Sequence, residues 1–304
     1  MPLNKTIYRT LAYFSYFGYP LTVFEIYKWQ SPHEGVMYSY HEIWDALQEN
    51  DDLKRRVENK HGHYAIRRAG GESVSIQLKE RKTRFLNAIE KYKKLQKVVR
   101  YLSRISSIKG IAICNSLAFH FTREKSDIDL LIITEEGETW NARLQSVLPL
   151  ILLKQRPGEA KKNPIDLSFF LAKNHFDISQ LKAGDNDPYL AVWTRSLVPI
   201  YGDEEVFEEF YEKNTWAEQT HQRAKRPRRA EAFRARKKPR LQLPSLPEQL
   251  TETLQESRFP DDIVNTANRD SRVMIAEGIL KFHKNDRRAE ISQHMHDMMS
   301  LWTK

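Results

Sequence analysis

The sequence predicts an α+β protein in which a small mixed β-sheet is flanked by helices. A separate module of short helices and a β-hairpin precedes this sheet, and further helices follow it. Two observations support the prediction. The first 50 residues contain short helical segments with start signals, and three strand-like apolar segments follow a long amphipathic stretch. The 304 residues are enough to bury more than one core.

The composition limits the class of protein. Cys114 is the only cysteine, which excludes an intramolecular disulfide and a zinc site built on cysteines. No apolar run approaches the roughly 20 residues that a membrane helix needs, and the opening residues lack a signal-peptide pattern. We therefore expect a cytoplasmic protein with no membrane partner. The net charge of +9 favours a polyanionic partner, because clustered Lys and Arg bind phosphates with release of counterions.

Residues 1–70 are predicted to form a winged helix-turn-helix-like domain. Apolar residues recur at helical spacing over residues 5–17, and a Gly-Tyr-Pro sequence then ends the helix. A T-x-x-E capping box at Thr22 and an S-x-x-E capping box at Ser39 predict two more helices. The segment LKRRVENKHGHYAIRR is then predicted to form two extended arms joined by a turn at Gly62.

The two arms are expected to form a basic wing that binds phosphates, with the third helix in a groove of the nucleic acid. The arginines of this wing are Arg55, Arg56, Arg67 and Arg68. The alternative is a protein-interaction or dimerisation module. It is favoured by the acidic character of the third helix, which carries Glu42, Asp45 and Glu49.

Residues 71–106 are predicted to form one long amphipathic connecting helix. Its apolar stripe lies opposite a face rich in Lys and Arg. The stripe consists of Phe85, Leu86, Ile89, Tyr92, Leu95, Val99 and Leu102. We expect this helix to pack on the following domain with its basic face in water; contact of its lysines with nucleic acid is the alternative.

Residues 107–218 contain the three predicted strands, IKGIAIC, SDIDLLIIT and PIDLSFFLA, with the helical segment WNARLQSVLPLILLK before the third. Because side chains alternate along a strand, Asp127 and Asp129 point to the same face. On the third strand Asp166 shares a face with Ser168. The opposite face is predicted to carry Ile165, Leu167, Phe169 and Leu171. If the strands are neighbours, three carboxylates meet at one end of the sheet.

Three neighbouring carboxylates raise each other's pKa unless cations lie among them. Mg²⁺ prefers oxygen ligands and keeps room for water and substrate phosphates. Two such ions about 3.5–4 Å apart can activate a hydroxyl and neutralise a leaving pyrophosphate. The acids therefore predict a metal site that is reached from solvent.

These residues resemble the DNA polymerase β-like nucleotidyltransferase superfamily over roughly residues 107–172. The family signature is a strand, a small Gly-Ser turn, a helix, D-x-D at the start of the next strand and a third acid on a later strand. Asn115-Ser116 stands at the turn, the S-D-I-D form begins at Ser126, and Asp166 occupies the third acid position. Asn115 replaces the usual glycine, and asparagine is the non-glycine residue that best tolerates a left-handed backbone.

The resemblance implies a catalytic domain with two Mg²⁺ or Mn²⁺ ions and a nucleoside triphosphate substrate such as ATP. The implied metal ligands and catalytic residues are Asp127, Asp129 and Asp166. The implied nucleotide-binding residues are Asn115 and Ser116, with Ser126 before the acids. We add Arg123 and Lys125 as weaker phosphate contacts, with solvated surface charge as the alternative.

The resemblance also implies template-independent transfer of a nucleotide to the 3′-OH of a nucleic acid, with RNA favoured and single-stranded DNA possible. One alternative is nucleotidylation of a hydroxyl on a protein or small molecule. Another is a winged-helix DNA-binding regulator whose inactive transferase domain senses nucleotide.

Residues 219–245 are predicted to be a basic linker, and their only acid is Glu231. A segment of this kind repels itself and is expected to stay disordered until it meets a polyanion, so nucleic-acid contact is predicted, with an unstructured linker as the alternative. The basic residues assigned to this contact are Arg226, Arg228, Arg229, Arg236, Lys237 and Lys238.

Residues 246–304 are predicted to be a helical segment, with helical character resuming near Ser271. His283 could reach an acceptor's phosphates together with Arg287 and Arg288, and a salt-bridge cluster with Asp286 is the alternative.

Overall fold

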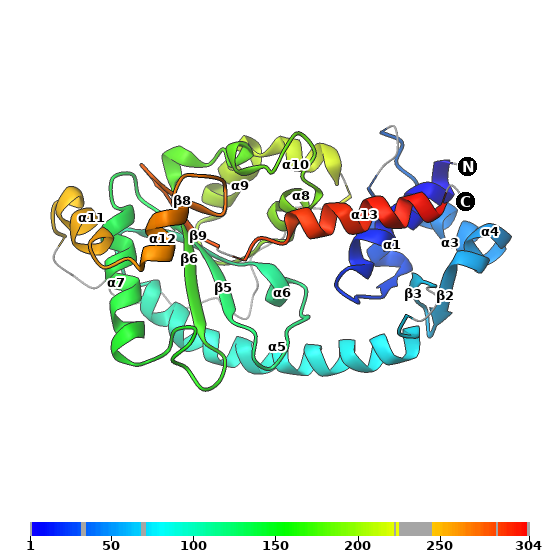
Figure 1. Ribbon diagram of the computed structural model, residues 1–304, viewed down its shortest axis with the longest axis horizontal. Coiled ribbons are helices and arrows are strands. Elements are labelled where there is room, and N and C mark those ends of the chain that lie inside the picture. The colour runs from blue at the N-terminus through cyan, green and yellow to red at the C-terminus, as the bar shows by residue number, and fades with distance from the viewer. Residues whose placement is uncertain are drawn as a thin grey trace.

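The computed structural model describes residues 2–31, 35–67, 71–221, 223–224, 245–283 and 285–302. It is an α+β structure with a mixed sheet flanked by helices, as predicted, and a second, smaller sheet near the N-terminus. The long helix α5 (Val74–Leu102) extends from the N-terminal module along the central sheet (Figure 1). No helix in the described ranges is both long and apolar enough to cross a membrane.

The N-terminal module contains the predicted helices and hairpin. Its elements are α1 (Pro2–Ser15), β1 (Leu21–Thr22), α2 (Val23–Trp29), α3 (Tyr40–Glu49), α4 (Asp51–Arg56), β2 (Val57–Lys60) and β3 (His63–Ile66). Both capping boxes form: the Thr22 hydroxyl accepts from the backbone N–H of Glu25, and the Ser39 hydroxyl from that of Glu42, each at 3.2 Å. The hairpin turns at Gly62, whose φ of 73° suits glycine, and the sheet order is β1-β3-β2.

The first part of the predicted wing is helical, which corrects the sequence prediction for Arg55 and Arg56. Both arginines belong to α4. The side chain of Asn50 caps this helix by accepting from the Leu53 N–H at 3.0 Å, and Asp51 and Asp52 occupy its first turn. An amide cap and acids at the N-terminus stabilise a helix, so the extended arm begins only at β2.

Helix α5 matches its predicted range, but the predicted apolar stripe is partly wrong. Phe85, Leu86 and Ile89 are exposed by 40 to 54%. The buried face instead carries Arg84, Ala88, Lys91, Leu95, Val99 and Leu102. The first half of the helix contacts the N-terminal module, where Arg81 pairs with Glu25, and Lys91 near its middle donates to the loop before Asp127, so polar side chains are buried along this part of the helix.

The central sheet has the strand order β7-β4-β5-β6-β9-β8. Its strands are β4 (Ile108–Ile113), β5 (Ile128–Thr134), β6 (Ile165–Ala172), β7 (Val198–Gly202), β8 (Val273–Ala276) and β9 (Ile279–Phe282). Strands β5 and β6 are parallel, and the other neighbours are antiparallel. Helix α7 (Thr139–Leu152) forms the crossover between the parallel strands, and the single-turn α6 (Asn115–Ala118) follows β4.

Helices cover both faces of this sheet (Figure 1). Helices α5 and α7 pack on one face through Leu95, Val99, Val147 and other apolar residues. On the other face lie α8 (Pro188–Ser196), α9 (Glu204–Lys213) and α10 (Thr215–Thr220). The short 3₁₀ turns η1 (Lys173–His175) and η2 (Ser179–Leu181) follow β6.

A β-bulge in β6 changes which residues share a face. Ile165 and Leu167 pack with α5 and α7, whereas Phe169 and Leu171 pack with α8 and α9. The register shifts between Asp129 and Leu131 of the paired strand β5. The predicted common face of Ile165, Leu167, Phe169 and Leu171 is therefore wrong, because the bulge adds one residue to the alternation.

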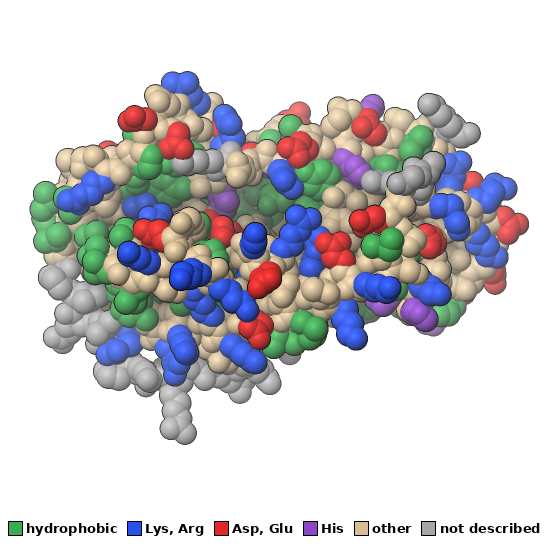
Figure 2. Space-filling model, turned by 60° about the horizontal axis from the view of Figure 1, so that its bottom comes forward, with side chains coloured by type: hydrophobic (Ala, Val, Ile, Leu, Met, Phe, Trp, Pro, Cys, Tyr) green, Lys and Arg blue, Asp and Glu red, His purple; other side chains and the backbone are tan. Residues whose placement is uncertain are grey.

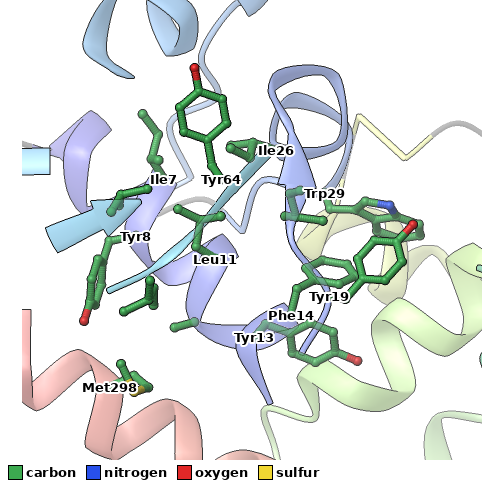
Figure 3. Packing of buried hydrophobic residues seen from close by; sticks show 14 of the residues in the cluster. Ile7, Tyr8, Leu11, Tyr13, Phe14, Tyr19, Ile26, Trp29, Tyr64 and Met298 are labelled. Atoms are coloured by element: carbon green, nitrogen blue, oxygen red, sulfur yellow. The ribbon is translucent and has the colours of Figure 1, made fainter. Parts of the chain in front are cut away.

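The C-terminal region contains a hairpin where the sequence predicted a helix. Strands β8 and β9 pair around Gly278 and extend the central sheet next to β6. Helices α11 (Glu248–Glu256) and α12 (Asp261–Thr266) precede this hairpin, and α13 (Arg288–Trp302) follows it. Helix α13 returns to the N-terminal module and lies beside α1, where Met298 packs against the same core as Tyr8 (Figure 3).

Candidate functional site

The three predicted carboxylates meet at one end of the parallel strand pair. Asp129 and Asp166 are direct partners in the register of β5 and β6, and Asp127 immediately precedes β5. All three side chains are partly buried. The bulge in β6 lies just beyond Asp166, so the irregularity is placed at the acids themselves.

The electrostatics of this group disfavour three negative charges. Burial, followed by repulsion from Asp166 and Asp127, raises the pKa of Asp129 to about 7. Burial also raises the pKa of Asp166 to about 6, although a hydrogen bond from Ser168 opposes the shift. The pKa of Asp127 is raised by burial and held back by the charge of Lys91. Positive charge at this end of the sheet would therefore stabilise the ionised acids.

The donor chemistry fits a hard divalent cation. Carboxylate oxygens on two paired strands are the ligands that Mg²⁺ and Mn²⁺ accept in proteins. A cation among the three acids would also relieve their mutual repulsion. In the part of the chain that the structure describes, no three Asp, Glu, His or Cys side chains are grouped closely enough to hold a metal ion, so the fit rests on the chemistry of the acids and on the strand pairing of Asp129 with Asp166.

Asn115 has the left-handed backbone that the sequence suggested it would tolerate, with a φ of 55°. Its side-chain oxygen accepts from the indole N–H of Trp193 at 3.0 Å and from the Tyr189 hydroxyl at 3.4 Å. Its amide also hydrogen-bonds to Asp129 and lowers that pKa. Asn115 thus links the acids to α8, and Ser116 follows it in α6.

The loop before Asp127 holds the other predicted nucleotide-binding residues. Arg123 and Lys125 are exposed on it. The Ser126 hydroxyl accepts from the backbone N–H of Arg123 at 3.1 Å, so this hydroxyl shapes the turn.

Lys91 is a residue of this site that the sequence analysis missed. Its side chain on α5 is fully buried and donates to the carbonyls of Glu124 and Ser126, at 3.1 and 2.6 Å. It also donates to the side-chain oxygen of Asn163 at 2.8 Å. Burial lowers the pKa of Lys91, and the charge of Asp127 opposes that shift. The lysine fixes the loop that carries Asp127.

One further group near Asp166, Arg156, was also missed, and the contact between Ser168 and His283 was not predicted. The charge of Arg156, in the loop after α7, lowers the pKa of Asp166. Behind the carboxylate, the Ser168 hydroxyl lies 3.2 Å from Nε2 of His283, and burial lowers the pKa of this histidine to about 3. His283 therefore lies beside Ser168, where burial disfavours its charged form. Arg288 forms the alternative salt bridges, to Asp286 and Asp187.

A cavity of about 290 Å³ adjoins the Asn115-Ser116 turn. Eight of its twelve lining residues are aromatic. They come from α1 and the turn after it, from the segment after α6, and from α8. The cavity could not be predicted from the sequence, because its walls are separated by about 100 residues and meet only through tertiary packing.

Only three of the residues predicted to contact nucleic acid, Arg55, Arg56 and Arg67, lie in the described part of the chain. Arg55 pairs with Asp52, and Arg56 pairs with Asp52 and donates to the Leu301 carbonyl at 2.7 Å. Arg67 is exposed at the end of β3. The remaining predicted contacts, Arg68, Arg226, Arg228, Arg229, Arg236, Lys237 and Lys238, lie outside the described residues. On the face in Figure 2, Lys and Arg side chains are interspersed with Asp and Glu.

No protein-family model matches the chain, and neither the curated proteins nor the solved structures contain a significant match to it.

Proposed function

We propose that this protein is a metal-dependent nucleotidyltransferase with a polymerase β-like catalytic domain. The observation that carries the proposal is the pairing of Asp129 with Asp166 beside Asp127, together with the raised pKa of all three acids. The left-handed turn at Asn115 supports it, because the Asn115 side chain hydrogen-bonds to Asp129 and Ser116 follows it directly. The order of β4, α6, β5, α7 and β6 is that of the family signature.

Each residue has a role in this proposal. Asp127 and Asp129 would hold the two ions, which when bound polarise the acceptor hydroxyl and neutralise the leaving group. Asn115 and Ser116 would hold the triphosphate. The acceptor oxygen bonds to the α-phosphorus, the bond from that phosphorus to the β-phosphate oxygen breaks, and pyrophosphate leaves. Asp166, which pairs with Asp129 in the strand register, would help to activate the hydroxyl and would take its proton.

The 3′-OH of a nucleic acid, with RNA favoured over single-stranded DNA, is the proposed acceptor. The net charge of +9 and the basic segment of residues 219–245 support this choice. The order of helices and hairpin in residues 2–67 also supports a winged-helix-like module that would help to bind the acceptor.

A small-molecule hydroxyl is the second candidate acceptor, and the aromatic cavity favours it. A pocket next to the proposed triphosphate turn can enclose a compact substrate, whereas a nucleic acid needs an open, positively charged groove. The two acceptors differ in what the product is: an extended primer or a nucleotidylated small molecule.

The test is incorporation of labelled nucleotide into short RNA and DNA primers with Mg²⁺ or Mn²⁺. We expect the wild-type protein to extend RNA, and the Asp127→Ala, Asp129→Ala double variant to lose at least about 10³-fold in rate, as expected when metal ligands are removed. The matched control is Glu208→Ala, Glu209→Ala, which removes two exposed acids of α9 and should keep the activity. Equal rates in the two double variants would disprove the assigned metal site. Absence of incorporation by the wild type into primers, proteins and small hydroxyl compounds would disprove the transferase.

A further inference from the structure

The aromatic cavity joins two parts of the chain. The N-terminal module contributes Tyr13, Phe14, Phe17 and Tyr19, and the central domain contributes Phe119 and Trp193 among others. Figure 3 shows Tyr13, Phe14 and Tyr19 gathered at the end of this module's core, near Trp29. The cavity is therefore present only when the two parts pack together.

The chemistry of the lining selects an uncharged, flat group. None of the described residues that line the cavity carries a charge, so a phosphate or ammonium group would lose its hydration without compensation. Aromatic side chains favour an aromatic partner in offset or edge-to-face geometry. The rings already present adopt edge-to-face contacts, with centroids 5.9 Å apart for Phe14 and Phe119 and 4.7 Å apart for Tyr19 and Phe121.

The polar edge of the cavity lies towards the carboxylates. Asn115 and Ser116 line it, and the same Asn115 side chain that accepts from Trp193 also hydrogen-bonds to Asp129. A ring held against Phe14, Phe119 and Trp193 would thus have its polar substituents directed to Asn115 and the acids beyond it.

We propose that this cavity binds an uncharged planar aromatic ring of a substrate of the Asp127–Asp129–Asp166 site. The role of the ring compound as a substrate rests on the proposed nucleotidyltransferase function, whereas binding of the ring to the cavity does not. The ring has two sources: the base of the nucleoside triphosphate, or an aromatic group on a small acceptor that carries the hydroxyl. The chemistry of recognition, stacking in an apolar aromatic enclosure, is the same for both.

The experiment measures binding of ring compounds by saturation-transfer NMR and calorimetry, without metal and without triphosphate. One arm uses the four ribonucleosides, with ribose as the uncharged compound that lacks a base. The other arm uses simple aromatic alcohols, with cyclohexylmethanol as the non-aromatic compound. We expect saturation transfer to the ring protons in at least one arm, and none to ribose. The arm that binds identifies the source of the ring.

Two variants locate the binding. Val192→Phe adds a ring from a cavity-lining position of α8 and should weaken binding at least tenfold. Phe17→Ala removes a partly buried wall residue and should weaken it about fivefold, in line with loss of one aromatic contact. Phe24→Ala, which removes an exposed phenylalanine of α2 outside the cavity, is the control. Each variant is first matched to the wild type in thermal unfolding.

The outcomes separate this proposal from the proposed function. Failure of every ring compound to bind, or equal affinity in Val192→Phe and wild type, would overturn the proposal even if labelled nucleotide is transferred. Ring binding that is lost in Val192→Phe would support the cavity proposal even if no nucleotide is transferred. The absence of transfer would then contradict only the proposed catalytic role of the acids.

Discussion

Asp129 is a carboxylate whose surroundings favour its neutral form. Replacement by asparagine removes a charge that burial and two neighbouring acids destabilise, so we predict that Asp129→Asn unfolds at a higher temperature than wild type in metal-free buffer at pH 8. A difference of one between the folded and unfolded pKa corresponds to about 1.4 kcal/mol, so a gain of roughly 2–4 kcal/mol is expected. The measurement is thermal unfolding with EDTA present.

The gain from Asp129→Asn should depend on pH in one direction. A carboxyl whose pKa is raised to about 7 on folding binds more protons in the folded than in the unfolded state between about pH 4 and 7. The wild type therefore loses stability as pH rises through this range, and the variant loses less. At pH 4 the two proteins should unfold at nearly the same temperature. A gain that is equally large at pH 4 and pH 8 would contradict the electrostatic explanation.

Replacement of Lys91 should destabilise the protein, because its buried ammonium group donates to three oxygen atoms. Lys91→Met removes these hydrogen bonds and leaves the carbonyls of Glu124 and Ser126 without their donor. We expect a loss of about 3 kcal/mol in the free energy of unfolding by urea, as for removal of a buried charged partner. Lys93→Met, at an exposed position of the same helix, is the control and should change stability by less than about 0.5 kcal/mol.

The acids and the Asn115 turn could be predicted from the sequence, because strand alternation and backbone preference are local properties. Lys91 could not be identified as easily, since most helix lysines are solvated. Its only local signal is its register: it lies three residues after Ala88 and four before Leu95, on the buried face of α5. No local feature of the sequence indicates Trp193 and Tyr189 as partners of Asn115, because these contacts span more than 70 residues.

At the scale of elements, α2 and α5 are joined by a two-point ion pair. Nη1 and Nη2 of Arg81 donate to the two carboxylate oxygens of Glu25, at 3.0 and 2.6 Å. The Arg81 guanidinium also lies 4.2 Å from the centre of the Tyr19 ring. Burial alone would raise the pKa of Glu25, but the bonds from Arg81 and from the Thr22 backbone lower it below its usual 4.5. The pair therefore contributes stability above that pH.

We predict that Arg81→Met lowers the free energy of unfolding by about 2 kcal/mol at pH 7, as for a hydrogen-bonded charged pair. Because the pKa of Glu25 is lowered on folding, the wild type loses this advantage as pH falls below 4.5, and the difference from the variant should shrink towards pH 3. Urea unfolding at several pH values measures it. Arg100→Met, at an exposed position of α5, should show no such convergence, and a constant difference for Arg81→Met would contradict the assignment.

The sequence predicted elements well where the start signal was local, as for α2 and α3 with their capping boxes. The hairpin of β8 and β9 was missed because each strand has four residues and Ile275 and Ile279 also fit a helical spacing. What selects the strand is pairing with β6, about 110 residues earlier in the chain. The β6 bulge was missed for the same reason, since a one-residue slip is visible only against the partner strand.

At the scale of the whole molecule, α13 connects the end of the described chain to the N-terminal module. Trp302 lies against Tyr8 with ring centres 5.0 Å apart, and the Arg56 guanidinium lies 5.0 Å from its ring. We predict that Trp302→Ala costs about 2 kcal/mol, less than for a fully buried aromatic because the side chain is partly exposed. Thermal unfolding and limited proteolysis of α13 would measure this change. Leu301→Ala, half exposed on the same turn, should behave like wild type.

The two attachments of α5 also have a consequence for its length. Arg81 holds the N-terminal module and Lys91 holds the Asp127 loop, ten residues or about 15 Å apart along one rigid helix. A single inserted residue between them would rotate one attachment by about 100° relative to the other. Seven inserted residues would restore the rotation but lengthen the helix by about 10 Å, and the two halves of the cavity would separate. The helical phase and length between these two residues therefore help to set how the two halves of the aromatic enclosure face each other.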